Sequence, residues 1–213
     1  MTLTEWFILA LACLAGASSP GPSLALLVQT VITDGRKAGV VFGLAHGLGI
    51  FFYAFVVASG LNIALSFVPF HGIFIEISGL IFMMWLAFLM FKNSLAIDKF
   101  DEVEAFKASH SISWHARSGF LIVFLNPKVA IFFLAIFTQF LGENSSFEAK
   151  SLMVLTATVI DAGWYVFITF IIAMPRFVRI LEPNSKRLEF ILGCIFLVIC
   201  ILLSYKIVMV LFG

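Results

Sequence analysis

The chain has few charged residues for its length. Only 12% of its 213 residues are Asp, Glu, Lys or Arg, whereas 62% are hydrophobic. A soluble domain is about half apolar and about a quarter charged. The composition therefore excludes an ordinary soluble domain and indicates a polytopic membrane protein embedded in a lipid bilayer. A formal net charge of +1 provides no basic field, so we expect no nucleic-acid partner.

Several chemical sites are also missing from the sequence. Cys13, Cys194 and Cys200 lie in apolar runs, and no pair has a C-x-x-C spacing; they are predicted to be buried, reduced cysteines and not a redox pair. The sequence has no phosphate-binding glycine-rich loop, metal-ligand cluster or nucleophile triad. These are the motifs that nucleotide, metal and nucleophilic chemistry require. We therefore expect no enzyme activity, metal, cofactor or ATP-driven step.

Long apolar runs predict an all-α integral membrane fold. A membrane-spanning helix needs about 20 apolar residues, and six such segments fit the sequence. They form a single polytopic domain over residues 1–213, with a cytoplasmic loop at about 92–117. The expected helices cover about 4–33, 38–66, 73–91, 118–141, 151–174 and 188–211.

Lys and Arg are unevenly distributed among the loops. Positively charged loops favour the cytoplasmic side, so the loops after the first, third and fifth helices are predicted to be cytoplasmic and both termini external. The two halves would then have opposite orientations, as in two inverted three-helix repeats that rock against each other. Ten basic residues lie in these three loops: Arg36, Lys37, Lys92, Lys99, Lys107, Arg117, Arg176, Arg179, Lys186 and Arg187.

Proline interrupts the first and fourth predicted helices, which are counterparts in the two halves. Proline removes a backbone donor and clashes with the preceding helical turn. In lipid, a broken backbone is tolerated where protein or a water-filled cavity surrounds it. The paired breaks therefore predict a substrate site, while a packing kink remains the alternative. The residues at the breaks are Ser19, Pro20, Gly21, Pro22 and Ser23 in the first helix, and Asn126 and Pro127 in the fourth.

Two charged residues are predicted near the middle of the bilayer. Lys128 and Asp161 each lie about ten residues, or roughly 15 Å, inside a helix. An intramembrane charge is costly and faces a partner or a wet cavity. Lys128 is a candidate ligand for a substrate carboxylate; a structural ion pair is the alternative. Asp161 is a candidate proton carrier, ammonium ligand or static partner of Lys128.

Half-helix ends suit a small zwitterion, because amide groups face its carboxylate and carbonyls face its ammonium. Trp164 and Tyr165 follow Asp161 within about one helical turn and are expected to shape the same cavity, although aromatic packing explains them equally well.

A glycine stripe marks the second predicted helix. Gly39, Gly43 and Gly47 recur every four residues, which allows another helix to approach closely. The stripe is predicted to pack helices together, and it would also serve a homo-oligomer interface. His46 lies beside it and is interpreted as a hydrogen-bonded packing residue, with a proton relay as the alternative.

These motifs together resemble the LysE/RhtB family of bacterial amino-acid exporters along nearly the whole chain. The resemblance implies a secondary active exporter of amino acids or close derivatives, driven by the proton motive force across the bacterial inner membrane, with periplasmic termini. It assigns substrate binding to the two breaks, Lys128, Trp164 and Tyr165, and proton coupling to Asp161. Where the family often carries Tyr-Leu, this chain has Phe82-Met83 after Gly79, which leaves the substrate open. An exporter of another small solute and a non-transporting membrane scaffold remain the alternatives.

Overall fold

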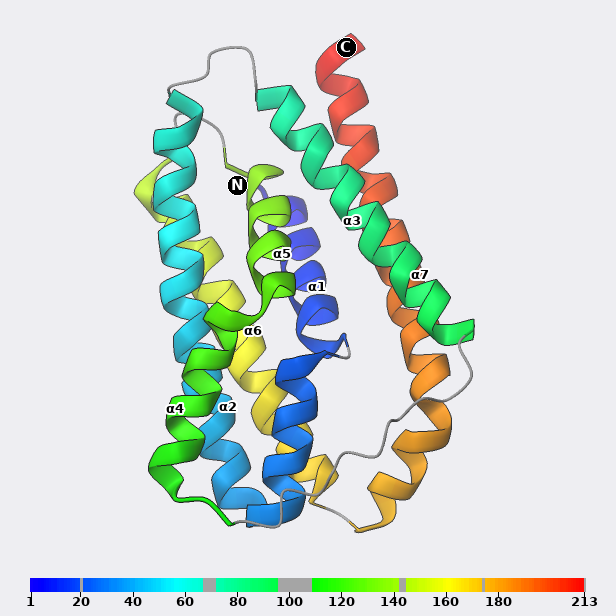
Figure 1. The fold of residues 1–213 in the computed structure, drawn as a ribbon. Helices are drawn as coiled ribbons and strands as arrows, with labels where there is room; N and C mark the ends of the chain where they lie inside the picture. Colours follow the sequence, from blue (N-terminus) through cyan, green and yellow to red (C-terminus); the bar gives the residue numbers. More distant parts are fainter. Residues whose placement is uncertain (20, 67–71, 96–108, 142–144, 174, 213) are drawn as a thin grey trace.

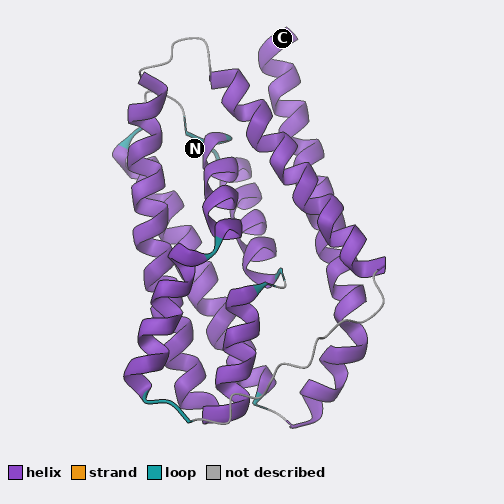
Figure 2. Ribbon diagram, viewed as in Figure 1, coloured by secondary structure: helices purple, strands orange, loops and turns teal. Residues whose placement is uncertain are grey.

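A computed structural model shows a bundle of helices, without strands in the part of the chain that it describes (Figures 1 and 2). All residues are described except 20, 67–71, 96–108, 142–144, 174 and 213. Pro20 and about half of the predicted cytoplasmic loop thus lie outside the described residues. The helices are α1 (Leu3–Ser18), α2 (Pro22–Ser66), α3 (Gly72–Leu95), α4 (Ile112–Leu125), α5 (Pro127–Thr138), α6 (Phe147–Ile172) and α7 (Pro175–Phe212).

The first break separates α1 from α2. Helix α1 ends at Ser18, the backbone is extended at Ser19, and α2 begins at Pro22. Proline is well suited to a first helical position, where no intrahelical partner exists for its missing N–H. Helix α2 is itself interrupted at Gly35, whose φ of +81° favours glycine. Residues 22–34 descend to this turn and residues 36–66 return beside them (Figure 1).

The second break separates α4 from α5, whose axes differ by 60°. Asn126 is extended between the two helices, and its side-chain Oδ1 accepts a hydrogen bond from the backbone N–H of Lys128 at 3.1 Å. This contact caps the N-terminus of α5, where backbone donors lack partners inside the helix. Both breaks predicted from proline are therefore ends of separate helices.

The glycine stripe of α2 packs against α6. A Cβ added at Gly39, Gly43 or Gly47 would lie within 3.1 Å of an α6 side chain. This close approach confirms that the stripe packs helices together. Because α6 covers these glycines within the chain, they are unavailable as the proposed oligomer interface.

The two halves of the sequence are interleaved in space. Helix α2 packs against α4 and α6, whereas α3 packs mainly against α7 and α5. Figure 1 shows α3 and α7 running side by side as a pair next to the other helices. The largest packing surfaces therefore join one sequence half to the other. The rocking of one half against the other stays a prediction.

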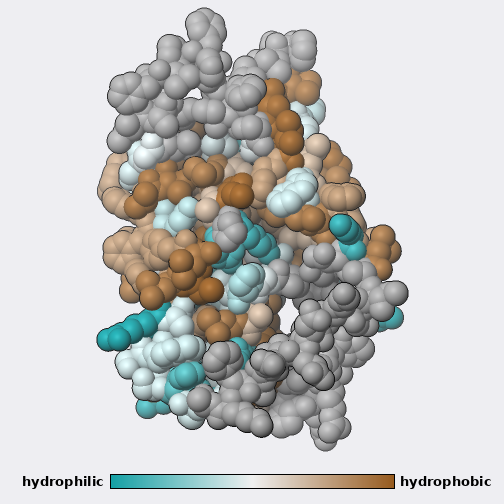
Figure 3. Space-filling view, in the orientation of Figure 1, coloured by the Kyte–Doolittle hydropathy of each residue, from teal (hydrophilic) through white to brown (hydrophobic). Residues whose placement is uncertain are grey.

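On the face that Figure 3 shows, an apolar band crosses the middle of the bundle. Figure 3 shows hydrophobic residues around its middle and more hydrophilic residues near the start of α4. Three described helices are long and apolar enough to cross a membrane, and the bent α4–α5 pair makes a fourth if it counts as one span. Two shorter apolar helices cover Leu3–Ser18 and Gly79–Lys92. These features identify a helical membrane protein.

Candidate functional site

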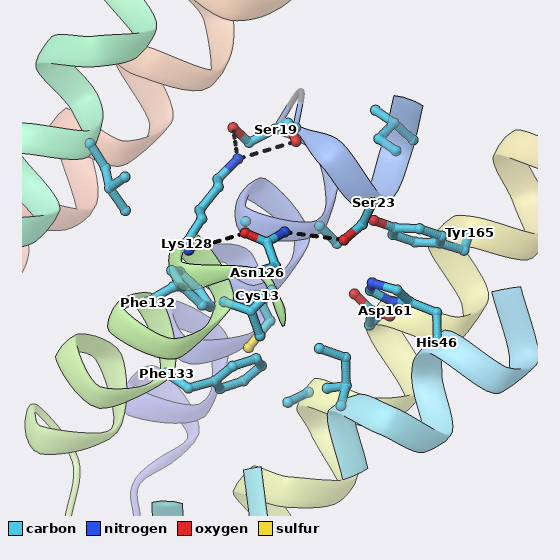
Figure 4. A pocket seen from close by; sticks show the side chains of 18 of the residues that line it. Cys13, Ser19, Ser23, His46, Asn126, Lys128, Phe132, Phe133, Asp161 and Tyr165 are labelled. Carbon is cyan, nitrogen blue, oxygen red and sulfur yellow. Dashed lines mark hydrogen bonds and ion pairs between the residues drawn. The ribbon is translucent and has the colours of Figure 1, made fainter. Parts of the chain in front are cut away.

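The two helix breaks line one cavity of about 50 Å³. Its wall includes parts of α1, α2, α5 and α6 as well as the two linking segments (Figure 4). Such a volume accommodates a few water molecules. Seven of the residues predicted for the site line it: Ser19, Gly21, Ser23, Asn126, Lys128, Asp161 and Tyr165.

Lys128 reaches from the start of α5 to the end of α1. Its Nζ donates hydrogen bonds to Oγ of Ser19 at 2.5 Å and to the carbonyl oxygen of Ser19 at 3.3 Å. The C-terminal end of a helix carries a partial negative charge, which favours a nearby cation. Lys128 thus places a positive charge in the cavity wall (Figure 4), where a substrate carboxylate can compete for its N–H groups.

Asn126 connects the two breaks directly. Its Nδ2 donates a hydrogen bond to Oγ of Ser23 at 3.1 Å, while its Oδ1 caps α5. Both Asn126 and Ser23 are buried, so losing this contact would leave polar groups without solvent. A single side chain therefore couples the start of α2 to the start of α5.

Asp161 forms a buried acid–base pair with His46. Nδ1 of His46 lies 2.7 Å from Oδ2 of Asp161, and the residues are 2% and 7% exposed, respectively. Nε2 of His46 has no hydrogen-bond partner among the described residues. The ring of Tyr165 stacks on His46 with a centroid distance of 4.1 Å, and its hydroxyl points toward Ser23 (Figure 4). This pair can hold a proton at the cavity wall.

Three of the predicted site residues that the structure describes do not line this cavity: Trp164, Pro22 and Pro127. Trp164 lies in a groove between α1 and α6 that does not include the break residues. Successive helical residues are separated by about 100°, so its neighbour Tyr165 faces the cavity while Trp164 does not. Pro22 begins α2 with an exposed side chain, and Pro127 begins α5.

Among the cavity residues that were not assigned to the site from the sequence, Cys13 and His46 carry titratable side chains. Cys13 lies on α1, and its position in an apolar run gave no signal beyond burial. His46 was interpreted as a hydrogen-bonded histidine, which its contact with Asp161 confirms. Its spacing of three residues from Gly43 placed it on the same side of the helix as the packing stripe. That spacing was the available signal that His46 faces α6.

Broken helices that surround a cavity with a cation and a buried acid–base pair define a membrane transport protein. The chain belongs to the LysE type translocator family, which matches residues 14–207. It is thus a transporter and not an enzyme.

Relatives named as efflux proteins match most of the chain. A threonine efflux protein of Salmonella typhi is 23% identical over 197 residues, covering 91% of this chain and 94% of the relative. A leucine efflux protein of Enterobacter sp. (strain 638) is 24% identical over 169 residues, covering 79% and 78%, respectively. No solved structure gives a significant match.

Proposed function

We propose that the protein is a proton-coupled secondary exporter of amino acids or close derivatives. The observation that carries this proposal is the cavity where both helix breaks meet, with Lys128 and the His46–Asp161 pair in its wall. Relatives named as threonine and leucine efflux proteins support an amino-acid substrate. An amino acid carries a carboxylate and an ammonium, which match the two kinds of charge at the cavity.

The proposed membrane arrangement has six spans and two inverted halves. Helix α1 with residues 22–34 forms the first span, and residues 36–66 form the second. The third is α3, the fourth is α4 with α5, and α6 and α7 complete the set. The excess of Lys and Arg in the loops after the first, third and fifth spans supports a cytoplasmic Gly35 turn and periplasmic termini. The bilayer would be the bacterial inner membrane.

Substrate binding requires the cavity to widen. At about 50 Å³, it has room for a few water molecules and not for an amino acid. Separation of α1 from α5 would release Lys128 from Ser19, making its ammonium available to the substrate carboxylate. Backbone N–H groups in the first turn of α2 would add donors. The substrate ammonium would face the carbonyls at the end of α1.

The His46–Asp161 pair would carry the coupling proton. It lies in the same cavity wall as Lys128, so the proton and substrate can influence the same conformational change. Intramembrane Asp and His residues serve as proton relays in transporters. In this proposal, a proton entering from the periplasm resets the pair after the amino acid has left.

Counterflow in proteoliposomes tests the proposed function. Vesicles are loaded with each of a panel of amino acids, and exchange with a labelled external pool is followed for the wild type and Lys128→Met. We expect exchange of one or a few amino acids and a loss of about tenfold or more in Lys128→Met, since a hydrogen bond to a charged group contributes about 1.5–3 kcal/mol.

Lys92→Met is the matched control because Lys92 is an exposed residue near the end of α3. Its exchange rate should match the wild type. Absence of exchange for every amino acid, in protein shown to be inserted and folded, would contradict the proposal and favour another solute or a scaffold. Equal exchange by Lys128→Met would instead contradict the assigned binding site.

A further inference from the structure

A second cavity lies at the opposite end of the 22–34 segment, beside the Gly35 turn. It has a volume of about 200 Å³, several times that of the cavity at the breaks. Its wall combines Leu26, Thr30 and Asp34 of α2 with Trp114 and His115 of α4. A cavity of this size has room for more than a few water molecules. Its lining provides an apolar surface together with hydrogen-bonding groups.

Two buried atoms in this wall have no hydrogen-bond partner among the described residues. Thr30 is 3% exposed and His115 is 1% exposed. Among the described residues, neither Oγ1 of Thr30 nor Nδ1 of His115 has a hydrogen-bond partner. Buried polar groups normally have partners, because burial without one costs free energy. Both side chains line the same cavity, which indicates a polar ligand that satisfies them together.

Asp34 adds a carboxylate to this cavity. It accepts hydrogen bonds from Oγ of Ser109 at 2.6 Å and from the backbone N–H of His110 at 3.3 Å. Its Oδ2 also lies 3.0 Å from Nε2 of His115. Hydrogen bonds donated to a carboxylate favour its charged form. A carboxylate offers about four acceptor positions, which leaves capacity for another donor.

The second cavity and the first are lined by different parts of the same α2 segment. Leu24 lines the cavity at the breaks, whereas Thr30 lines the second cavity. Six residues separate them, or about 9 Å along a helix. The fully buried Leu27 lies between them and packs in an apolar cluster with Ile122 of α4. A polar solute in the second cavity is thus separated from the first by an apolar layer.

We propose that the second cavity is a cytoplasmic recruitment site for the zwitterionic amino acid that the protein exports. Asp34 and Nδ1 of His115 would accept hydrogen bonds from the ammonium, while the Thr30 hydroxyl would donate to the carboxylate. Leu26 and Trp114 would contact the apolar part of the substrate. The amino acid would then pass the Leu27 layer to reach Lys128. The identity of the ligand and the cytoplasmic location rest on the proposed function.

Thr30→Val separates ligand binding from folding. Valine has a similar shape, and the lost hydroxyl has no partner among the described residues, so the variant should fold as well as the wild type. We expect the KM for efflux to rise about tenfold, as for loss of one hydrogen bond to a charged ligand, with the maximal rate within about twofold. Thr158→Val is the matched control, because Thr158 lies on α6 outside both cavities.

Slower labelling of an introduced cysteine detects a ligand in the second cavity without relying on transport. Thr33 lines the second cavity and is exposed, whereas Ser113 is exposed but outside the lining. Thr33→Cys and Ser113→Cys in full-length protein are treated with a hydrophilic maleimide while each amino acid of the panel is added at millimolar concentration. The wild type measures labelling of its three native cysteines. We expect at least one amino acid to slow labelling of Thr33→Cys several-fold and leave Ser113→Cys unchanged.

Additional substitutions identify which of the two cavities holds the amino acid that protects Thr33→Cys from the maleimide. It should persist when Lys128→Met is added and disappear when Thr30→Val is added. Protection that requires Lys128, or its absence for every amino acid, would overturn the recruitment site. Counterflow without protection would reject this site while retaining the proposed export function. Protection without counterflow would support an amino-acid site but reject the export function.

Discussion

At the residue scale, the His46–Asp161 pair is the feature that can distinguish proton coupling from substrate binding. The pair is buried, with a contact of 2.7 Å. Removing the charge of one partner of a buried pair leaves the charge of the other partner without compensation. Because the pair lies apart from Lys128 in the cavity wall (Figure 4), its loss should affect coupling more than substrate exchange.

Asp161→Asn should reduce proton-driven efflux about tenfold or more, while amino-acid counterflow stays within about threefold of the wild type. The amide retains a hydrogen-bonding group but cannot cycle a proton, and loss of a charged hydrogen bond costs about 1.5–3 kcal/mol. Efflux driven by an imposed pH gradient and counterflow without a gradient are measured in the same proteoliposomes. Glu148→Gln, at an exposed position in the first turn of α6, is the control. Equal loss of both activities in Asp161→Asn would contradict a dedicated coupling role.

The sequence identified the unusual charges of the site but not their partners. Lys128 and Asp161 were predicted from their depth within apolar runs. The structure places Lys128 against Ser19 and Asp161 against His46. These contacts bridge 109 and 115 residues, respectively. Helical periodicity predicts neighbours within a helix, but contacts between distant helices depend on their packing.

At the element scale, the fit between α2 and α4 depends on Gly119. A Cβ at this position would lie 2.5 Å from the carbonyl oxygen of Phe42 and 3.2 Å from its Cα. Gly163, on α6, has no neighbouring heavy atom within 4 Å of the corresponding position. These two helical glycines thus provide contrasting sites for adding a single methyl group.

Gly119→Ala should lower the free energy of unfolding by about 1–3 kcal/mol, because backbone atoms must move to accommodate the added methyl group. Gly163→Ala should be neutral or stabilising by up to about 1 kcal/mol, since alanine favours a helix more than glycine does. Thermal unfolding of the purified proteins in detergent compares the variants. Equal stability of Gly119→Ala and the wild type would contradict the close packing of α2 on α4.

The start of α4 was harder to predict than its break. Proline made the end near Asn126 evident, but the predicted start at about residue 118 was six residues later than Ile112. Ser111 caps the helix by accepting a hydrogen bond from the backbone N–H of Trp114. The first turns of α4 contain polar residues, and one of them, His115, contacts Asp34 of α2. Apolar content alone therefore concealed the beginning of the helix.

At the scale of the whole molecule, the proposed site lies near the junction of two groups of helices. Helices α3 and α7 pack on each other and contact the remaining helices mainly through α5 and α1. Those contacting helices end or begin at the breaks that line the cavity. The loop charges of the sequence predicted two halves. Which helices pack together across the halves could be seen only in the three-dimensional structure. Movement between these spatial groups would change the site directly.

Substrate should shift the α3–α7 pair relative to the other helices, because sliding or hinge motion between packed groups can open a ligand site. Spin labels at Trp85→Cys on α3 and Leu121→Cys on α4 report across the junction, and both positions are exposed. Labels at Leu44→Cys on α2 and Val159→Cys on α6 provide an exposed control pair within the other group. Pulsed electron-spin resonance in nanodiscs should show a substrate-dependent distance change across the junction and little change for the control. A change confined to the control pair would place the motion within the α1, α2, α4, α5 and α6 group, whereas unchanged distances for both pairs would contradict a domain-scale motion on binding.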